Sequence, residues 1–226
     1  MNSYRRTAIN IGILFIIATV FLFVGGALYG PALDTPDFLE AAYPNRTSAT
    51  IGILVEFSCI IAITLIPVFA FPVLRKHSET LALGYLVFRL FEAVLFILVD
   101  ITKLSLIKVS QLHLGADSAS ADAIANIGAV ILGWNEWAWV FYVFIFGIGA
   151  LIFYTALFQS RLLPRWISIW GLIAIVMMMT SAVLAMFEVA IPDALFGLLV
   201  VPIALQEMVM AVWLIIKGFD PQFVEK

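Results

Sequence analysis

Four ionisable residues recur on one face of an apolar stretch near the middle of the chain. Arg89, Glu92, Asp100 and Lys103 lie within residues 80–108, a stretch otherwise typical of a membrane-spanning helix. At about 100° per residue, Asp100 falls within roughly 20° of Arg89, and Lys103 falls within roughly 20° of Glu92. An ionisable group in hydrocarbon costs about 2.5–3.5 kcal/mol on insertion scales, so this stripe is predicted to face other helices.

Three acids on other apolar stretches could complete a polar site with this stripe, namely Glu56, Glu136 and Glu207. Near the midplane, Arg89 has two possible carboxylate partners. Glu92 lies three residues away on the same helix and can pair locally. A Glu207 carboxylate left alone at that depth would have to take up a proton. We therefore expect Glu207 to be the better partner of Arg89.

The depth of these residues allows two interpretations of their role. An Arg89–Glu207 pair could be a strut that fixes how the third and sixth spans pack, or it could be the floor of a polar pocket open to the outside. The walls of such a pocket carry an excess of acid, which suits a cation, a proton or an amine-bearing ligand. The candidate ligand-binding residues are Glu56, Arg89, Glu92, Asp100, Lys103, Glu136 and Glu207.

Signatures of other chemistries are missing from the sequence. It contains no HExxH, no GxSxG, no glycine-rich phosphate loop and no Cys–His pair. Cys59 is the single cysteine, and both histidines, His77 and His113, fall in expected loops. We therefore expect no catalytic residue, no metal and no cofactor. An intramembrane enzyme using two carboxylates such as Glu92 and Glu207 is the third functional hypothesis.

The composition defines the elements that must position these residues. Of the 226 residues, 64% are hydrophobic and 12% are charged, whereas a soluble domain has about 25% charged residues. The formal net charge of −3 is small and indicates no nucleic-acid partner. The sequence predicts an all-α, polytopic membrane protein made of one domain, a bundle of six transmembrane helices. The predicted spans are residues 8–29, 49–74, 80–108, 137–158, 166–187 and 194–217.

The first span follows Arg5 and Arg6, as the apolar core of a secretory signal would. Its run is longer than a usual signal core and lacks a clean cleavage site, so we expect the span to be retained. Gly26 and Gly30 give a GxxxG spacing at its end, which permits close contact with another helix.

Residues 123–132 are apolar but too short to cross about 30 Å of hydrocarbon. Because residues 133–137 contain glycine and polar side chains, we predict a short outer interfacial helix at residues 123–132, before the fourth span. An extension of the fourth span is the alternative.

Six spans place both termini on the same side of the membrane. The positive-inside rule then predicts that this side is the cytoplasm. A seventh span at residues 123–132 would move Arg161 and Arg165 to the outside, which argues against it. The other side carries Arg46, Lys103 and Lys108. The basic residues on the side of the termini are Arg5, Arg6, Arg75, Lys76, Arg161, Arg165, Lys217 and Lys226.

Several short segments in the second half of the chain carry a family resemblance. They are residues 146–147, 151–154, 160–167 (SRLLPRWI) with Gly171, and Glu207 followed by residues 213–218 (WLIIKG). These segments resemble an uncharacterised family of bacterial integral membrane proteins, catalogued as a domain of unknown function (DUF4386). The resemblance covers most of the chain and implies a bacterial inner-membrane protein that retains its first helix. It implies no activity, cofactor or catalytic residue.

The sequence thus favours an integral membrane protein that binds or moves a small ligand or cation through an outward-facing, carboxylate-rich pocket. The alternative is a structural or regulatory membrane subunit whose buried charges serve packing only. The expected partners are the lipid bilayer and a small cation or amine-bearing ligand, and a homo-oligomer is left open.

Overall fold

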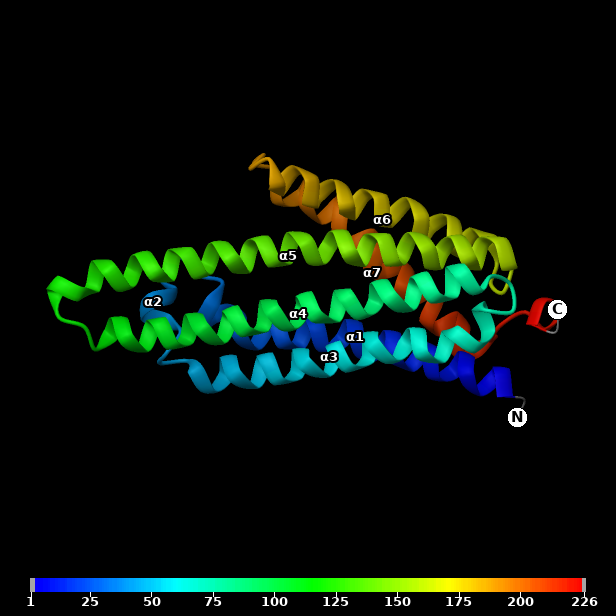
Figure 1. Ribbon diagram of the computed structural model, residues 1–226, viewed down its shortest axis with the longest axis horizontal. Helices are drawn as coiled ribbons and strands as arrows, with labels where there is room; N and C mark the ends of the chain where they lie inside the picture. The colour runs from blue at the N-terminus through cyan, green and yellow to red at the C-terminus, as the bar shows by residue number, and fades with distance from the viewer. Residues whose placement is uncertain (1–2, 225–226) are drawn as a thin grey trace.

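The computed structural model describes residues 3–224, which form helices joined by short connections (Figure 1). Six of the helices in this part of the chain are long and apolar enough to cross a membrane. The predictions of an all-α fold and of six spans are therefore confirmed. The helices are α1 (Ser3–Leu33), α2 (Phe38–Ala41), α3 (Arg46–Leu74), α4 (Glu79–Leu114), α5 (Ser118–Ser160), α6 (Arg165–Met186), α7 (Asp193–Ile216) and α8 (Pro221–Val224).

Local sequence signals determine where several spans begin and end. Helix α4 begins after Ser78, whose side-chain oxygen accepts the Leu81 N–H at 3.3 Å. Helix α7 ends before Gly218, which has φ +77° and donates its N–H to the Trp213 carbonyl at 3.2 Å. A non-glycine residue would be strained at that φ, so the glycine marks the end of the last span.

Helix α5 corrects the prediction for the fourth span. It is continuous over Ser118–Ser160, 43 residues, which is about 64 Å at 1.5 Å per residue. Residues 123–132 are therefore not a separate interfacial helix, and Gly133 does not interrupt the helix. The Asn135 amide group donates to Thr102 Oγ1 at 2.7 Å and to the Val99 carbonyl at 3.2 Å, so α5 is tied to α4 at the predicted break.

The start of α5 lies at the tip of a helical hairpin. Asp117 Oδ1 accepts the Ser120 N–H at 2.9 Å, and hydrogen bonding to Ser120 lowers the pKa of Asp117. Because α5 is about twice as long as the hydrocarbon thickness, the α4–α5 hairpin extends beyond the other helices at the end opposite the termini (Figure 1).

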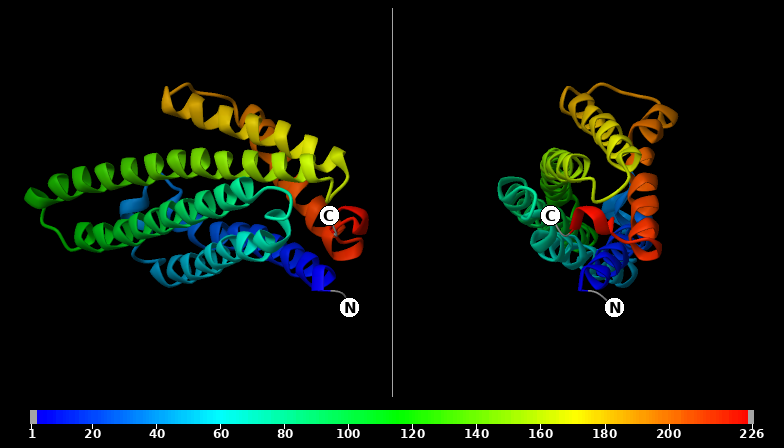
Figure 2. Two further views of the ribbon diagram at one scale, coloured as in Figure 1. Left: turned by 45° about the vertical axis from the view of Figure 1, so that its right-hand side comes forward. Right: turned by 90° about the vertical axis from the view of Figure 1, so that its right-hand side faces the viewer.

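The long helices form a bundle with one outlying pair. Helix α3 packs against α1 and α4, and α5 packs against α4 and α6. Helix α7 packs against α6 and α1, which closes the arrangement, while α2 lies against α4. Helices α6 and α7 diverge from the rest of the bundle toward their connecting turn (Figures 1 and 2).

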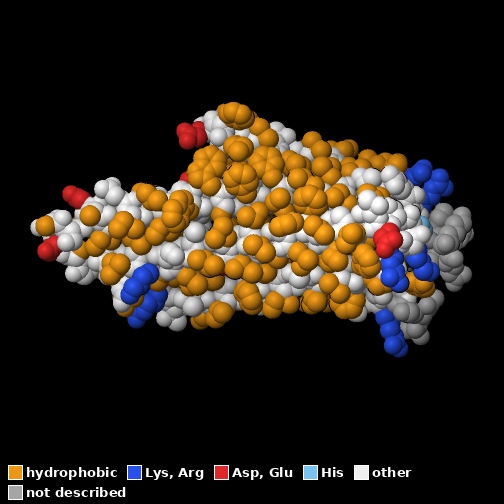
Figure 3. Space-filling view, viewed as in Figure 1, with side chains coloured by type: hydrophobic (Ala, Val, Ile, Leu, Met, Phe, Trp, Pro, Cys, Tyr) orange, Lys and Arg blue, Asp and Glu red, His pale blue; other side chains and the backbone are white. Residues whose placement is uncertain are grey.

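Both termini lie at one end of the bundle (Figure 1). Lys and Arg side chains gather at this end, with a smaller group toward the opposite end (Figure 3). Of the eight basic residues expected here, Lys226 lies outside the described residues.

The crossing of α1 and α3 brings two backbones into contact. A Cβ added at Gly52 would lie 2.7 Å from the Gly25 carbonyl oxygen, and one at Gly25 would lie 2.8 Å from the Gly52 carbonyl oxygen. The predicted contact at Gly26 and Gly30 is not the one used, because a Cβ at Gly26 would meet only Tyr29 of its own helix. One turn beyond the Gly25–Gly52 contact, Tyr29 of α1 lies beside α3.

Candidate functional site

The charged stripe on α4 is buried, as predicted. Arg89 is 2% exposed, Glu92 is fully buried, and Asp100 and Lys103 are each 6% exposed. Phe96 lies between the two pairs along the helix and is also fully buried. The stripe is therefore divided into an inner cluster at Arg89 and Glu92 and an outer cluster at Asp100 and Lys103.

The inner cluster consists of Tyr85, Arg89, Glu92 and Glu207. Arg89 Nη1 donates to the two Glu92 carboxylate oxygens at 2.9 and 3.1 Å, and Nε donates to the Tyr85 hydroxyl at 3.2 Å. Glu207 Oε1 lies 3.9 Å from Arg89 Nη2. The expectation that Glu207 is the better partner is wrong. Helix α7 packs on α1 and α6. The Glu207 carboxylate on α7 therefore lies at the edge of ion-pair range from Arg89.

Aromatic rings surround the Arg89 guanidinium. Its central carbon lies 5.4 Å from the centre of the Tyr85 ring and 5.2 Å from the centre of the Phe146 ring. A guanidinium at this range is attracted to the negative faces of both rings. Arg89 is therefore held, nearly fully buried, by its own helix, by α5 and at longer range by α7.

The outer cluster consists of Tyr29, Glu56, Asp100 and Lys103. Lys103 Nζ donates to Glu56 Oε2 and to Asp100 Oδ1, the latter at 3.4 Å. The Tyr29 hydroxyl donates to Glu56 Oε1 at 3.2 Å. The ammonium also lies 4.1 Å from the centre of the Tyr29 ring and 5.9 Å from that of Phe96. Three helices, α1, α3 and α4, thus build a cage of carboxylates and aromatic rings around one ammonium group.

The charges in the outer cluster are unequal. Two carboxylates, those of Glu56 and Asp100, face the single ammonium of Lys103. Asp100 Oδ2 is buried and has no hydrogen-bond partner among the described residues. Buried polar atoms normally have such a partner, so this oxygen marks a place where a further positive charge or donor would be stabilised.

Asp34 adds a third carboxylate near the outer cluster. It follows the last residue of α1 and is exposed. Partial burial raises the pKa of Asp34, Lys103 lowers it, and Glu56 raises it further. These influences show that Asp34 lies within electrostatic range of the buried cluster.

Glu136 is the one candidate residue that the structure brings to neither cluster. It is exposed on α5 and makes no polar contact with the described residues. Its neighbour Asn135 faces α4, and adjacent helical residues point about 100° apart. Within the described part of the chain, no group of three or more His, Cys, Asp or Glu side chains could hold a metal ion.

Sequence reasoning missed two members of the site, Tyr29 and Asp34. Tyr29 reaches Glu56 because Gly25 and Gly52 allow α1 and α3 to touch. The sequence does contain a signal for Tyr29. A tyrosine near the end of an apolar run has an apolar ring and a polar hydroxyl group, so it can join a polar site at the end of a span. Its partner depends on which helices are neighbours, which periodicity does not reveal.

A second polar tie joins α5, α6 and α7. The buried Tyr154 hydroxyl donates to Gln206 Oε1 at 2.6 Å, and the Gln206 amide donates to the Ile167 carbonyl at 3.0 Å. A Cβ at Gly171 would lie 2.6 Å from the Tyr154 ring, so this glycine makes room for the tyrosine. Several residues that carry the family resemblance therefore have packing roles.

Six apolar helices around two buried charge clusters define a multi-pass integral membrane protein. Residues 10–218 match the model of a family described as a domain of unknown function (DUF4386), and the chain belongs to that family. No curated protein and no solved structure was found to match the chain.

Proposed function

We propose that the outer cluster binds a small cation, which competes with the ammonium group of Lys103. The observation that carries this proposal is the buried, unpartnered Asp100 Oδ2 in a cluster with two carboxylates and one ammonium. An uncompensated buried charge is costly. A proton or a small cation added beside Asp100 would offset that cost.

The chemistry of the cage suits an ammonium-type ligand. Carboxylates make strong charge-assisted hydrogen bonds with ammonium groups, and aromatic faces attract cations. The Lys103 ammonium group makes both kinds of contact, with the Glu56 carboxylate and with the Tyr29 ring. An external amine or small cation with the same chemistry would replace it, and the exposed Asp34 carboxylate would attract such a ligand from water.

Binding, rather than passage through the protein, is the activity that this arrangement supports. Glu92 and Lys103 are 11 residues apart, or about 16 Å along α4. Between them lies the buried Phe96, whose ring packs against Trp139 and Tyr142. This apolar layer separates the clusters, so we assign the inner cluster a packing role.

The proposed location is a bacterial inner membrane with both termini in the cytoplasm. The basic side chains at the end that carries the termini support this orientation (Figure 3). The outer cluster and Asp34 would then face the outside of the cell.

The test is thermal unfolding of the detergent-purified protein in methylammonium, sodium or potassium chloride, at an ionic strength kept constant with tetraethylammonium chloride. A ligand that binds only the folded state stabilises it by about 2.7 kcal/mol at 100 times its Kd. At least one small cation is expected to raise the melting temperature of the wild type. Asp100→Asn should lose this response, and Glu136→Gln, at an exposed acid outside the cluster, should retain it.

Lys103→Met distinguishes competition from a general salt effect. Removing the internal ammonium should lower the stability without added cation and increase the affinity for methylammonium. A wild type that no small cation stabilises, or an Asp100→Asn variant that responds like the wild type, would contradict the proposal even if Lys103→Met fails to fold.

A further inference from the structure

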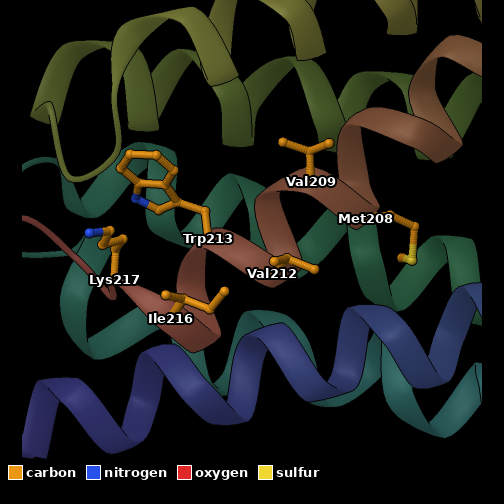
Figure 4. Close-up of a pocket in the computed structure, with 6 residues that line it drawn as sticks. All are labelled: Met208, Val209, Val212, Trp213, Ile216 and Lys217. Atoms are coloured by element: carbon orange, nitrogen blue, oxygen red, sulfur yellow. The ribbon is translucent and has the colours of Figure 1, made fainter.

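A groove of about 390 Å³ lies along one face of α7 (Figure 4). Lys217 and Trp213 lie at one end of this face and Met208 lies toward the other (Figure 4). Its lining is apolar apart from Lys217. The lining residues are Met208, Val209, Val212, Trp213, Ile216 and Lys217.

The groove opens to the outside of the bundle. Val209 is 36% exposed, Val212 is 47% exposed and Ile216 is 64% exposed. Because α7 is one of the six membrane-crossing helices, the medium that meets these side chains is lipid. Lys217 lies nine residues after Met208, which is about 14 Å along the helix, close to half of the roughly 30 Å hydrocarbon thickness. The groove therefore has the length of one leaflet.

Positive charge collects at the end of the groove nearest the termini. The Lys217 side chain is exposed and makes no hydrogen bond or ion pair with the described residues, although the Lys217 backbone N–H donates to the Trp213 carbonyl at 2.7 Å. Next to it, Arg5 donates to the carbonyls of the last turn of α7, at 2.8 Å for Leu214 and 3.1 Å for Ile216. The nearest acid along the chain, Asp220, accepts the Gln222 N–H. The Lys217 ammonium is therefore available to a negatively charged partner.

Trp213 indicates that the Lys217 end of the groove lies at the membrane boundary. Its ring packs edge-on against Trp166 at 6.2 Å between centres, and Trp166 follows the first residue of α6. Tryptophan side chains gather where hydrocarbon meets head groups. An acyl chain along Val209, Val212 and Ile216 would thus place its head group beside Lys217.

We propose that this groove binds an anionic phospholipid of the leaflet nearest the termini. One acyl chain lies along α7, and the phosphate pairs with the Lys217 ammonium. The excess of basic groups at this end favours an anionic lipid over a zwitterionic one. The site is independent of the outer cluster, because it lies on a different helix and at the opposite end of the bundle.

Native mass spectrometry of the full chain in neutral detergent tests this proposal. The protein would be titrated with phosphatidylglycerol and, separately, with phosphatidylcholine. We expect tighter binding of phosphatidylglycerol, and a loss of about fivefold in its affinity in Lys217→Gln, since one basic residue contributes roughly that factor near an anionic surface. Arg46→Gln, at an exposed basic residue at the opposite end, should bind like the wild type.

The acyl-chain part of the site needs its own variant. Val212→Phe fills the groove and should also weaken phosphatidylglycerol binding, whereas Val176→Phe, at a similarly exposed position on α6 (54%), should not. Equal affinity for the two lipids, or unchanged phosphatidylglycerol binding in both Lys217→Gln and Val212→Phe, would overturn the proposal.

Discussion

Arg89 shows how a buried arginine selects among carboxylates. Glu92 accepts two hydrogen bonds from one guanidinium nitrogen at 2.9 and 3.1 Å, whereas Glu207 approaches another nitrogen only to 3.9 Å. Glu92 is also fully buried. The local pair on α4 is therefore the stronger interaction, and the contact with α7 is the weaker one.

Substitution of the two carboxylates should reproduce this order. Glu92→Gln leaves Arg89 without its close countercharge, and breaking a buried pair costs about 3–5 kcal/mol. We expect a loss in the free energy of unfolding near the lower end of that range, because glutamine can still accept one hydrogen bond. Glu207→Gln should cost less than half as much. Thermal unfolding in detergent measures both, and a larger loss in Glu207→Gln would restore Glu207 as the main partner.

The charged stripe was predictable because ionisable residues in an apolar helix carry a large free-energy cost. Their shared face and their separation into two pairs along the helix both follow from spacing on α4. Spacing could not predict whether Glu92 or Glu207 is the closer partner of Arg89, because this depends on how α7 packs against α1 and α6. Tyr29 was missed for a similar reason, since its role depends on the neighbour of α1.

At the scale of helices, the contact between α1 and α3 determines the shape of the outer cluster. Gly25 and Gly52 let the two backbones touch, and this places Tyr29 against Glu56. Periodicity could not identify the contact, because α1 is apolar around most of its circumference. The length of α5 was missed because residues 123–132 are apolar enough to suit an interfacial helix or a helix continuing past the membrane.

Gly52→Ala should separate α1 from α3. Its Cβ would lie 2.7 Å from the Gly25 carbonyl oxygen and 2.9 Å from the Leu28 Cβ, and overpacking of this kind costs about 1–3 kcal/mol. We expect a lower melting temperature and a weaker cation response, because Tyr29 moves away from Glu56. Gly133→Ala is the matched control, since nothing lies within 4 Å of its added Cβ. Equal melting temperatures of the two variants would show that the helices are not in close contact.

At the scale of the molecule, charge and length differ between the two ends. The end with the termini carries most of the basic residues, and the opposite end carries the projecting α4–α5 hairpin (Figures 1 and 3). The positive-inside rule predicts that the basic end lies in the cytoplasm. The even number of spans accounts for the two termini lying at the same end.

Reporter fusions should confirm this orientation. A fluorescent protein fused after Ser160 should fluoresce in the cytoplasm, and alkaline phosphatase inserted after Ala116, between α4 and α5, should be active outside. Inactive phosphatase at Ala116 together with an external reporter at Ser160 would invert the proposed topology.

Arg5 of the first membrane helix, α1, bonds to the last one, α7, so this contact can form only after α7 has been synthesised. Its bond to the Leu214 carbonyl joins residues 209 positions apart. At about 5–20 residues per second, roughly 10–40 s pass between synthesis of Arg5 and of its partners in α7. During that interval α1 already has α3 as a neighbour, so the Gly25–Gly52 contact can hold the first helix before the last one arrives. The closing contact between α1 and α7 is therefore among the last to form.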